Sequence, residues 1–414
     1  MLTFTVALAL RVAFVIVVER PSFGFNDAFF YHSFGKSLAE GRGYVRIDGT
    51  PTAQWPPGWG FVLSLLYRIT GAKPLAGELL NAFFGALTVP LLFVVARRAF
   101  GRAEAAVAAG CLALLPGPVL WTDVLFSETF YTFVVVAFFA LLAVLPARWW
   151  GVVLLGVAVG LAALVRGEGM FLALPALAYW YRQMGLRAWF ARAAALAVLF
   201  ALTIAPWTIR NAVRLDAFAP ISSNVGATLW AGHNPSAYGG PTYYTDYERF
   251  GDDTIRRETK SARYLRGEAL DYMVHHPVRE LQLIPLKLVH MNRGDSEVLE
   301  LVNSAAPGDE PPLSGVEEVR LEVLANVGYY GLLTFTVASV ALLRRRLWRQ
   351  PLSRAALVAL ITALVLYGFF YFGSYRYRFP MEPLMILVAA PLVTGVWRSR
   401  GAIQEAGRGG AGAG

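Results

Sequence analysis

The chain has 414 residues, of which 56% are hydrophobic and 16% are charged, against roughly 25% charged in an ordinary soluble domain. This composition indicates a membrane protein and excludes an ordinary soluble enzyme. The formal net charge of +9 does not indicate nucleic-acid binding, because the arginines gather in short loops between apolar runs and suit the anionic cytoplasmic face of a membrane. The single cysteine, Cys111, lies inside an apolar run and excludes a disulfide framework.

Apolar runs that can cross a bilayer as helices recur along the whole chain, since one crossing takes about 20 helical residues. They are residues 2–18, 79–96, 105–120, 129–145, 152–164, 170–181, 193–206, 323–343, 355–372 and 380–396. We expect the first to be an uncleaved anchor, because Arg11 interrupts it and no small-residue cleavage site precedes Glu19. The sequence therefore predicts an all-α polytopic membrane protein with about ten (9 to 12) transmembrane helices.

Arginines in the short loops assign the two faces of the membrane. One set of loops holds Arg97, Arg98, Arg102, Arg148, Arg182, Arg187, Arg192, Arg344, Arg345, Arg346, Arg349, Arg354, Arg398 and Arg400. The opposite set holds Arg166, Arg376 and Arg378. The positive-inside rule makes the first set cytoplasmic, provided that "WGFVLSLLYRIT" (59–70) does not cross. We therefore expect that segment to be an interfacial or re-entrant helix on the outer side.

This topology divides the chain into four parts. Residues 1–206 are predicted to form an N-terminal transmembrane module with a catalytic first outer loop at 19–78. Residues 207–322 form an outer loop region and 323–400 the C-terminal transmembrane helices. The tail 401–414, "GAIQEAGRGGAGAG", is of low complexity and is predicted to be disordered.

Both long outer segments are predicted to contain helices. In the first, residues 28–40 are expected to lie in the membrane interface, with apolar residues on one face and Lys36 and Glu40 on another. The second, 210–320, carries 12 basic and 16 acidic residues and is the candidate for a mixed outer subdomain. It is expected to include an interfacial helix that starts at Pro277, and "PGDEPP" near its end is interpreted as a linker.

Charged residues from separate segments are predicted to meet near helix ends on the outer face. They are Asp27, Asp123, Glu128, Arg166, Glu168, Arg210, Arg376 and Arg378. Charges so close to hydrocarbon are costly, so this gathering indicates a site. The alternative is that each residue anchors a helix end at the headgroups.

Asp27 is the candidate general base. Desolvation near a bilayer raises the basicity of a carboxylate, while a nearby arginine keeps it ionised, and such an acid can deprotonate an acceptor hydroxyl or amine. Asp123, Glu128 and Glu168 are candidates to orient the acceptor or to act as a second acid. Their alternative role is to cap helices.

The segment "GSYRYRFPMEP" is predicted to bind a phosphate. Guanidinium groups of Arg376 and Arg378 can hold phosphate by charge-assisted hydrogen bonds, and Tyr375 and Tyr377 can cover sugar or isoprenoid surface. A phosphate bound at headgroup depth implies a lipid-borne one. Arg166 and Arg210 are further candidates for phosphate binding. The alternative is an aromatic belt with snorkelling arginines.

No resident cofactor is predicted. The five histidines have no metal-ligand spacing, so zinc is not expected, although the sequence leaves a divalent ion open. There is no Walker loop, dinucleotide fingerprint or nucleophile elbow. The energy for any transfer must therefore arrive in the substrate.

Several motifs together resemble a known family. They are "NDAFFYHSFGKSLAEGRGY", "PTAQWPPGWGFVLSLLYRITG", "ARRAFGR", "LFSETFYTF", "LVRGEG", "APWTIRN", "LWAGHNPSAYGG" and "YRYRFPMEP". In this order the chain resembles, over nearly its whole length, the bacterial integral-membrane GT-C glycosyltransferases that include protein O-mannosyltransferases and lipid A aminoarabinose transferases. The resemblance implies a GT-C bundle in the cytoplasmic (inner) membrane with its site facing the exterior or periplasm.

The resemblance also implies an inverting transfer from a polyprenyl-phosphate-linked sugar to a lipid, glycan or protein acceptor, as in protein glycosylation or lipopolysaccharide modification. Asp27 matches the acid that serves such enzymes as base. Two positions depart from the family pattern: Ala28 stands where a second acid often follows, and Trp55 stands where some relatives have a phosphate-binding lysine. The residues expected to line the substrate site are Tyr31, Trp55, Tyr375, Tyr377, His233 and Asn234.

Two other functions fit parts of the pattern. A transporter or flippase for a lipid-linked sugar would show two halves with matching hydropathy, which are not evident here. An O-antigen ligase or polymerase shares the substrate class and a large outer loop. The order of segments favours the first interpretation, because Asp27 precedes the second crossing and the largest outer loop comes late.

Overall fold

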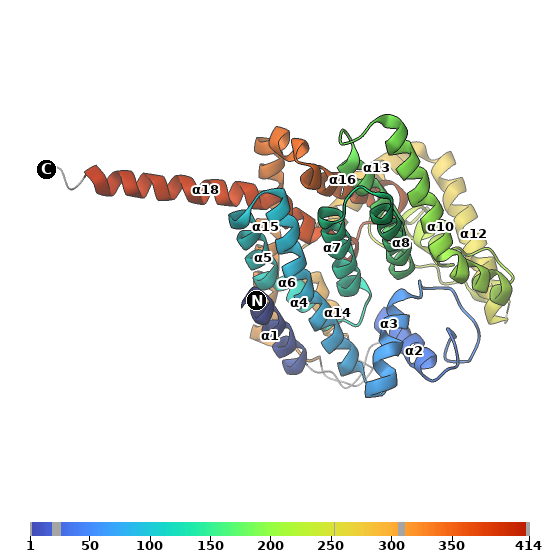
Figure 1. The fold of residues 1–414 in the computed structure, drawn as a ribbon. Coiled ribbons are helices and arrows are strands. Elements are labelled where there is room, and N and C mark those ends of the chain that lie inside the picture. The colour runs from blue at the N-terminus through green and yellow to red at the C-terminus, as the bar shows by residue number, and fades with distance from the viewer. Residues whose placement is uncertain (1, 19–25, 252, 305–310, 411–414) are drawn as a thin grey trace.

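A computed structural model describes residues 2–18, 26–251, 253–304 and 311–410 of the chain. Within these ranges the chain is helical, and its β-structure is one isolated bridge between Val45 and Pro51. Residues 307–310 of the predicted linker 307–312 lie outside the described residues. The helix α18 (Glu382–Gly410) continues into the predicted tail and projects from the bundle (Figure 1); the disorder of residues 401–414 stays a prediction.

The all-α polytopic architecture is confirmed. Five helical segments are long and apolar enough to cross a membrane: α4 (Pro74–Ala99), α10 (Leu186–Leu215), α15 (Gly315–Arg349), α16 with η3 (Pro351–Phe370), and α17, η4 and α18 over Tyr375–Trp397. Three shorter apolar helices accompany them: α1 (Leu2–Val17), α7 (Glu128–Val144) and α8 (Trp149–Val165).

The two other predicted crossings are helical but interrupted. Residues 105–120 fall on α5 (Arg102–Leu114) and α6 (Pro116–Leu120). The break comes at Leu115 because a proline disfavours helical geometry in the residue before it. Residues 170–181 fall on the 3-10 helix η1 (Gly167–Leu172) and on α9 (Ala173–Trp180). Each predicted span thus has a helical counterpart.

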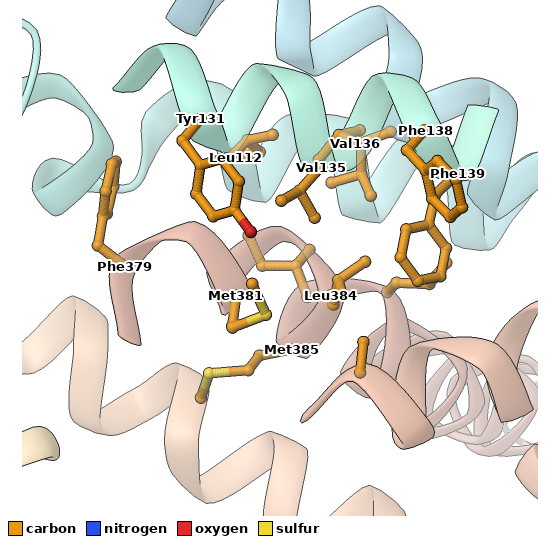
Figure 2. Packing of buried hydrophobic residues seen from close by; sticks show 14 of the residues in the cluster. Leu112, Tyr131, Val135, Val136, Phe138, Phe139, Phe379, Met381, Leu384 and Met385 are labelled. Carbon is orange, nitrogen blue, oxygen red and sulfur yellow. The ribbon is translucent and has the colours of Figure 1, made fainter. Parts of the chain in front are cut away.

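Helix α7 lies in the centre of the bundle, against α4, α8 and α18. Figure 2 shows its buried Tyr131, Val135 and Phe139 facing residues of η4 (Phe379–Met381) and α18. Because lipid tails are as apolar as these side chains, association here depends on close packing rather than on transfer out of water. Small residues allow such packing: a Cβ on Gly156 or Gly160 of α8 would lie 2.6 or 2.4 Å from a side-chain atom of α10.

The first outer loop forms a helical pair at one end of the bundle. Helix α2 (Asp27–Ala39) packs on α3 (Gly58–Thr70), and both lie beside the ends of α7 and α8 (Figure 1). At 1.5 Å per residue the 13 residues of α3 span about 20 Å, less than a hydrocarbon core of about 30 Å. Its buried Trp59 donates a hydrogen bond from Nε1 to the carbonyl of Leu125, 3.3 Å away. Short helices are therefore present where interfacial helices were predicted, and their position in the membrane interface stays a prediction.

The second long outer segment predicted from the sequence, 210–320, is called the late outer region. Its described residues form short helices around one long helix. They are α11 (Val225–Gly232), η2 (Glu248–Phe250), α12 (Thr254–His275), α13 (Pro277–Met291) and α14 (Glu297–Val302). Helix α13 begins at Pro277 as predicted and packs against η3 and α17 (Tyr375–Arg378). The buried carboxylate of Glu258 on α12 accepts hydrogen bonds from Arg46, Thr52 and Ser223 at 2.6 to 2.7 Å. Glu258 thereby ties the first outer loop to the late one.

Candidate active site

Asp27 occupies the first turn of α2. The helix starts there because the Asn26 side chain accepts a hydrogen bond from the amide of Ala28 (2.9 Å) and so caps the N-terminus. The Nδ2 of Asn26 also donates to Ser304 Oγ (3.1 Å), which joins α2 to the end of the late outer region. A carboxylate at a helix N-terminus is stabilised in its ionised form by the helix dipole.

Arg376 bridges two carboxylates from distant segments. Its Nη2 lies 2.6 Å from Asp27 Oδ2, and its Nε lies 2.8 Å from Glu128 Oε1. Residue 376 is positioned by α17, whose N-cap Ser374 accepts a hydrogen bond from the Arg376 amide (3.3 Å). The guanidinium also lies over the Phe126 ring, 4.3 Å from its centroid. The structure thus brings together three of the predicted site residues, 27, 128 and 376.

Arg166 extends this network into the interior of the protein. It ends α8 and lies 3.0 Å from Glu128 Oε1 and 3.3 Å from Glu168 Oε1. Its guanidinium carbon lies 5.6 Å from the centroid of the Tyr377 ring, which stacks on Tyr367 at 4.6 Å. Arg166 and Arg376 therefore join the carboxylates of three residues, and the stacked Tyr367 and Tyr377 rings lie beside Arg166.

Access divides the network. The side chains of Asp27 and Arg376 are 27% and 29% exposed, whereas that of Glu128 is fully buried and those of Arg166 and Glu168 are only slightly exposed. A substrate can therefore touch Asp27 and Arg376 directly. Glu128 contacts Arg376 and helps to fix the position of its guanidinium group.

The remaining predicted arginines lie elsewhere. Arg378 is buried between Asp295 and Glu382, with N–O distances of 2.6 Å to each. Arg210 donates hydrogen bonds to the carbonyls of Thr52 (2.7 Å) and Tyr44 (2.6 Å) and holds the first outer loop against α10. Neither joins the Asp27–Arg376 pair in these contacts.

The other predicted acid and aromatic residues take different positions. Asp123 is fully buried in the turn before α7. Tyr31 is buried, and its hydroxyl donates a hydrogen bond to Ser127 Oγ (3.2 Å). Trp55 stacks on Phe30, with 4.5 Å between the ring centroids, and Tyr375 packs near Trp121. Tyr31 and Trp55 thus stabilise the α2 region beside the site.

His233 and Asn234 are both buried. The Nδ1 of His233 lies 2.7 Å from Glu280 Oε2, and its Nε2 lies 3.1 Å from Lys287 Nζ. A histidine that carries its proton on Nδ1 satisfies both contacts. The side-chain Nδ2 of Asn234 donates hydrogen bonds to the Trp230 carbonyl (2.7 Å) and to Thr242 Oγ1 (2.6 Å). These contacts hold a loop in place.

Sequence reasoning missed Glu280 and Lys287. Burial lowers the pKa of the Lys287 ammonium group to about 8, and Glu280 opposes that change. The available signal was the position of Lys287 inside the apolar run "LIPLKLV" of α13. A lysine placed there suggests a buried partner, but the identity of that partner depends on a loop about 50 residues away.

In the part of the chain that the structure describes, no three or more His, Cys, Asp or Glu side chains gather to hold a metal ion. The expectation that there is no resident cofactor stays a prediction, and a divalent ion stays open. The two groups of this network that a substrate can reach are a carboxylate and a guanidinium, which suit proton removal and the binding of a phosphate.

Comparison with known proteins connects this geometry to a family. Residues 54–209 match the model of the family described as dolichyl-phosphate-mannose-protein mannosyltransferase. Comparison with curated proteins gives no match. The resemblance predicted from the sequence is confirmed for this segment.

Solved structures share the fold. The Archaeoglobus fulgidus oligosaccharyltransferase in the apo form aligns with a TM-score of 0.57 and 14% identity over 98% of this chain and 51% of its own. The archaeal oligosaccharyltransferase AglB from the same organism, in complex with an inhibitory peptide and a dolichol-phosphate, aligns with a TM-score of 0.52 and 12% identity. This alignment covers 97% of this chain and 52% of AglB. ArnT from Cupriavidus metallidurans bound to undecaprenyl phosphate aligns with a TM-score of 0.46 and 17% identity, over 95% of this chain and 78% of its own. The alignments with the oligosaccharyltransferase confirm the predicted GT-C type of fold. The chain spans about half the length of that protein.

Proposed function

We propose that this multi-pass membrane protein is a glycosyltransferase that moves a sugar from a polyprenyl-phosphate-linked donor to an acceptor hydroxyl or amine, with inversion at the anomeric carbon. One observation carries the proposal: the accessible Asp27–Arg376 pair, backed by the buried Glu128, at the helix ends of a GT-C fold. The dolichol-phosphate and undecaprenyl phosphate bound by two structural neighbours support a lipid-borne phosphate as part of the donor.

The chemistry follows from the two accessible groups. The carboxylate of Asp27 removes the proton of the acceptor as the acceptor oxygen or nitrogen attacks the first carbon of the sugar. The bond between that carbon and the phosphate oxygen breaks, and the polyprenyl phosphate leaves with the electron pair. Arg376 faces the developing phosphate charge, and because Glu128 and Phe126 already fix its guanidinium, little reorganisation is required.

Arg376 also couples the two parts of the reaction. In the structure its Nη2 contacts Asp27. A bound phosphate would compete with Asp27 for the same guanidinium, and this would free the carboxylate to act as base. Donor binding would then prepare the base, so that proton removal waits for the donor.

The proposal is tested by assaying sugar transfer from a panel of polyprenyl-phosphate sugars in proteoliposomes. We expect Asp27→Asn to lower turnover by about 10²- to 10⁴-fold, the usual contribution of a general base. Asp48→Asn is the matched control, because Asp48 is an exposed aspartate of the same outer loop whose carboxylate accepts hydrogen bonds from Thr50. Full turnover by Asp27→Asn would remove Asp27 from the mechanism.

We further propose that the site lies on the outer face of the cytoplasmic membrane. The arginine distribution and the shortness of α3 support this orientation. In a Cys111→Ala background, single cysteines at the exposed positions Ser236 and Gln183 test it directly. An impermeant thiol reagent added outside should label only Ser236→Cys, and labelling of Gln183→Cys alone would reverse the orientation.

A further inference from the structure

Arg376 is carried by a short helix that α13 holds from both sides. Helix α17 has four residues, too few to be stable through its own hydrogen bonds. On its C-terminal side, Arg378 donates a hydrogen bond to the carbonyl of Met291, the last residue of α13, at 3.1 Å. On its N-terminal side, the chain at Gly373 meets the backbone of α13 at Lys287. The place of Arg376 therefore depends on these two contacts.

The contact at Gly373 is a close approach between two backbones. Gly373 belongs to the segment 371–374, which joins η3 to α17. A Cβ on Gly373 would lie 1.9 Å from the Lys287 carbonyl oxygen and 2.8 Å from the Lys287 Cα. Non-bonded carbon atoms attract best at about 3.5–4.0 Å, so a side chain fits there only if one backbone moves. The Gly373 amide also donates a hydrogen bond to the Gly239 carbonyl at 2.8 Å.

Helix α11 holds the same segment from another side. A Cβ on Gly232, the last residue of α11, would lie 2.7 Å from the Tyr371 carbonyl oxygen. The next residue, His233, lies between Glu280 (2.7 Å) and Lys287 (3.1 Å) of α13. Breaking a buried charged contact is costly, because the partner left behind keeps its desolvation penalty. The segment that leads into α17 is therefore held between two helices that are fastened to each other.

A shift of this segment would reach the site directly. The side chain of Ser374 accepts a hydrogen bond from the Arg376 amide (3.3 Å) and so begins α17. The Arg376 guanidinium lies 2.6 Å from Asp27 and 2.8 Å from Glu128. A displacement of about 1 Å that originates far from the chemistry can lower a rate by about a hundredfold. The close approach before α17 is therefore part of what places the guanidinium.

We propose that Gly373 is a positioning residue for the donor phosphate: because it has no side chain, the chain before α17 approaches α13 closely enough to place Arg376 at Asp27 and at the phosphate. This inference rests on the proposed glycosyl transfer. Gly373 touches no reacting group in this account and acts through Arg376 alone. A glycine that serves only the packing would change stability and leave the phosphate affinity of the folded protein as it is.

The test measures the Kd for polyprenyl phosphate, with the whole chain in lipid nanodiscs, for wild type, Gly373→Ala, Arg376→Ala and the double variant. We expect Gly373→Ala to raise Kd by about 10- to 100-fold, the range for losing a hydrogen bond to a charged group. In the Arg376→Ala background, Gly373→Ala should cause no further loss, because two changes that act through one contact are not additive.

Two further glycine variants control this experiment. Gly267→Ala is the matched control, because Gly267 of α12 is exposed and a Cβ there meets no atom within 4 Å; its Kd should equal that of the wild type. Gly232→Ala changes the opposite side of the segment and should raise Kd as Gly373→Ala does. It decides the question if thermal unfolding shows that Gly373→Ala does not fold.

The outcomes separate the two proposals. A wild type that neither binds polyprenyl phosphate nor transfers sugar overturns the proposed function and, with it, the role of Gly373. A wild type that does both, with an unchanged Kd in the folded Gly373→Ala and Gly232→Ala variants, overturns the role of Gly373 alone. If the effects of Gly373→Ala and Arg376→Ala multiply in the double variant, the proposal is also wrong, because Gly373 would then act through another group.

Discussion

Arg376 and Arg378 stand two residues apart on one short helix and have opposite environments. Arg376 is partly exposed and meets Asp27 and Glu128, whereas Arg378 is buried and meets Asp295 and Glu382. Arg378 also donates hydrogen bonds to the carbonyls of Met291 (3.1 Å) and Arg293 (3.2 Å). The difference shows that the same residue type can be accessible to a substrate on one face of α17 and enclosed in the fold on the other; in the proposed reaction only the accessible arginine takes part.

The comparison gives a general expectation for this protein. Charges that remain accessible should govern turnover, and charges that are fully enclosed should govern stability. Each of the following variants tests one side of that division.

Removing the buried arginine should have the largest effect. We expect Arg378→Ala to destabilise the protein by about 3–5 kcal/mol, because the buried carboxyl groups of Asp295 and Glu382 would lose the guanidinium that compensates them. Thermal unfolding of the detergent-purified protein measures this loss. As control, the triple variant Arg378→Met, Asp295→Asn, Glu382→Gln replaces all three ionisable groups together and should recover most of the stability. A triple variant as unstable as Arg378→Ala would contradict the electrostatic explanation.

Removing the accessible arginine should instead affect the reaction. We expect Arg376→Ala to lower kcat by about 10²- to 10³-fold, as the loss of one preorganised group facing developing charge does elsewhere. Its unfolding temperature should fall less than that of Arg378→Ala, because Arg166 still pairs with Glu128. Arg42→Ala, at an exposed arginine of the first outer loop, is the activity control. If Arg42→Ala lowers kcat as much as Arg376→Ala does, the loss is not specific to Arg376 and the comparison fails.

A smaller effect is expected from the enclosed Lys287. Because burial lowers its pKa from 10.5 to about 8, the unfolded chain binds more protons than the folded one between these values, and stability should rise with pH in that window. The slope is at most about 1.4 kcal/mol per pH unit. Unfolding of the wild type and of Lys287→Met at pH 7.5 and 9.5 measures it.

We expect Lys287→Met to lose that increase and Lys260→Met, at an exposed lysine of the neighbouring helix α12, to retain it. If the stability of Lys287→Met depends on pH as that of the wild type does, then the lowered pKa of Lys287 is not the cause of the pH dependence.

The helical spans and the first outer loop could be predicted from the sequence because they depend on local patterns. Hydrophobic runs set the crossings, Pro277 set the start of α13, and Asn26 and Asp27 set the start of α2. The division between Arg376 and Arg378 was also accessible in principle. Residues i and i+2 of a helix point in different directions, yet the alternation with Tyr375 and Tyr377 suggested a single binding surface.

Other parts of the site depend on contacts between distant segments. Ala28 left the second acid open between Asp123 and Glu128, and the fold brings Glu128 to Arg376 across 248 positions of sequence. His233 was predicted to line the substrate site, but Lys287, 54 positions away, encloses it. No local pattern distinguishes a histidine facing a substrate from one that is held by a buried lysine.

The central claim is that the Asp27–Arg376 pair is the reaction centre. A cryo-EM structure of the protein with a bound antibody fragment and polyprenyl phosphate tests it most directly. The account predicts that the phosphate lies within hydrogen-bonding distance of the Arg376 guanidinium and displaces it from Asp27, with Arg378 unchanged between Asp295 and Glu382. A phosphate bound at Arg210 or Arg378, with the Asp27–Arg376 contact intact, would contradict it.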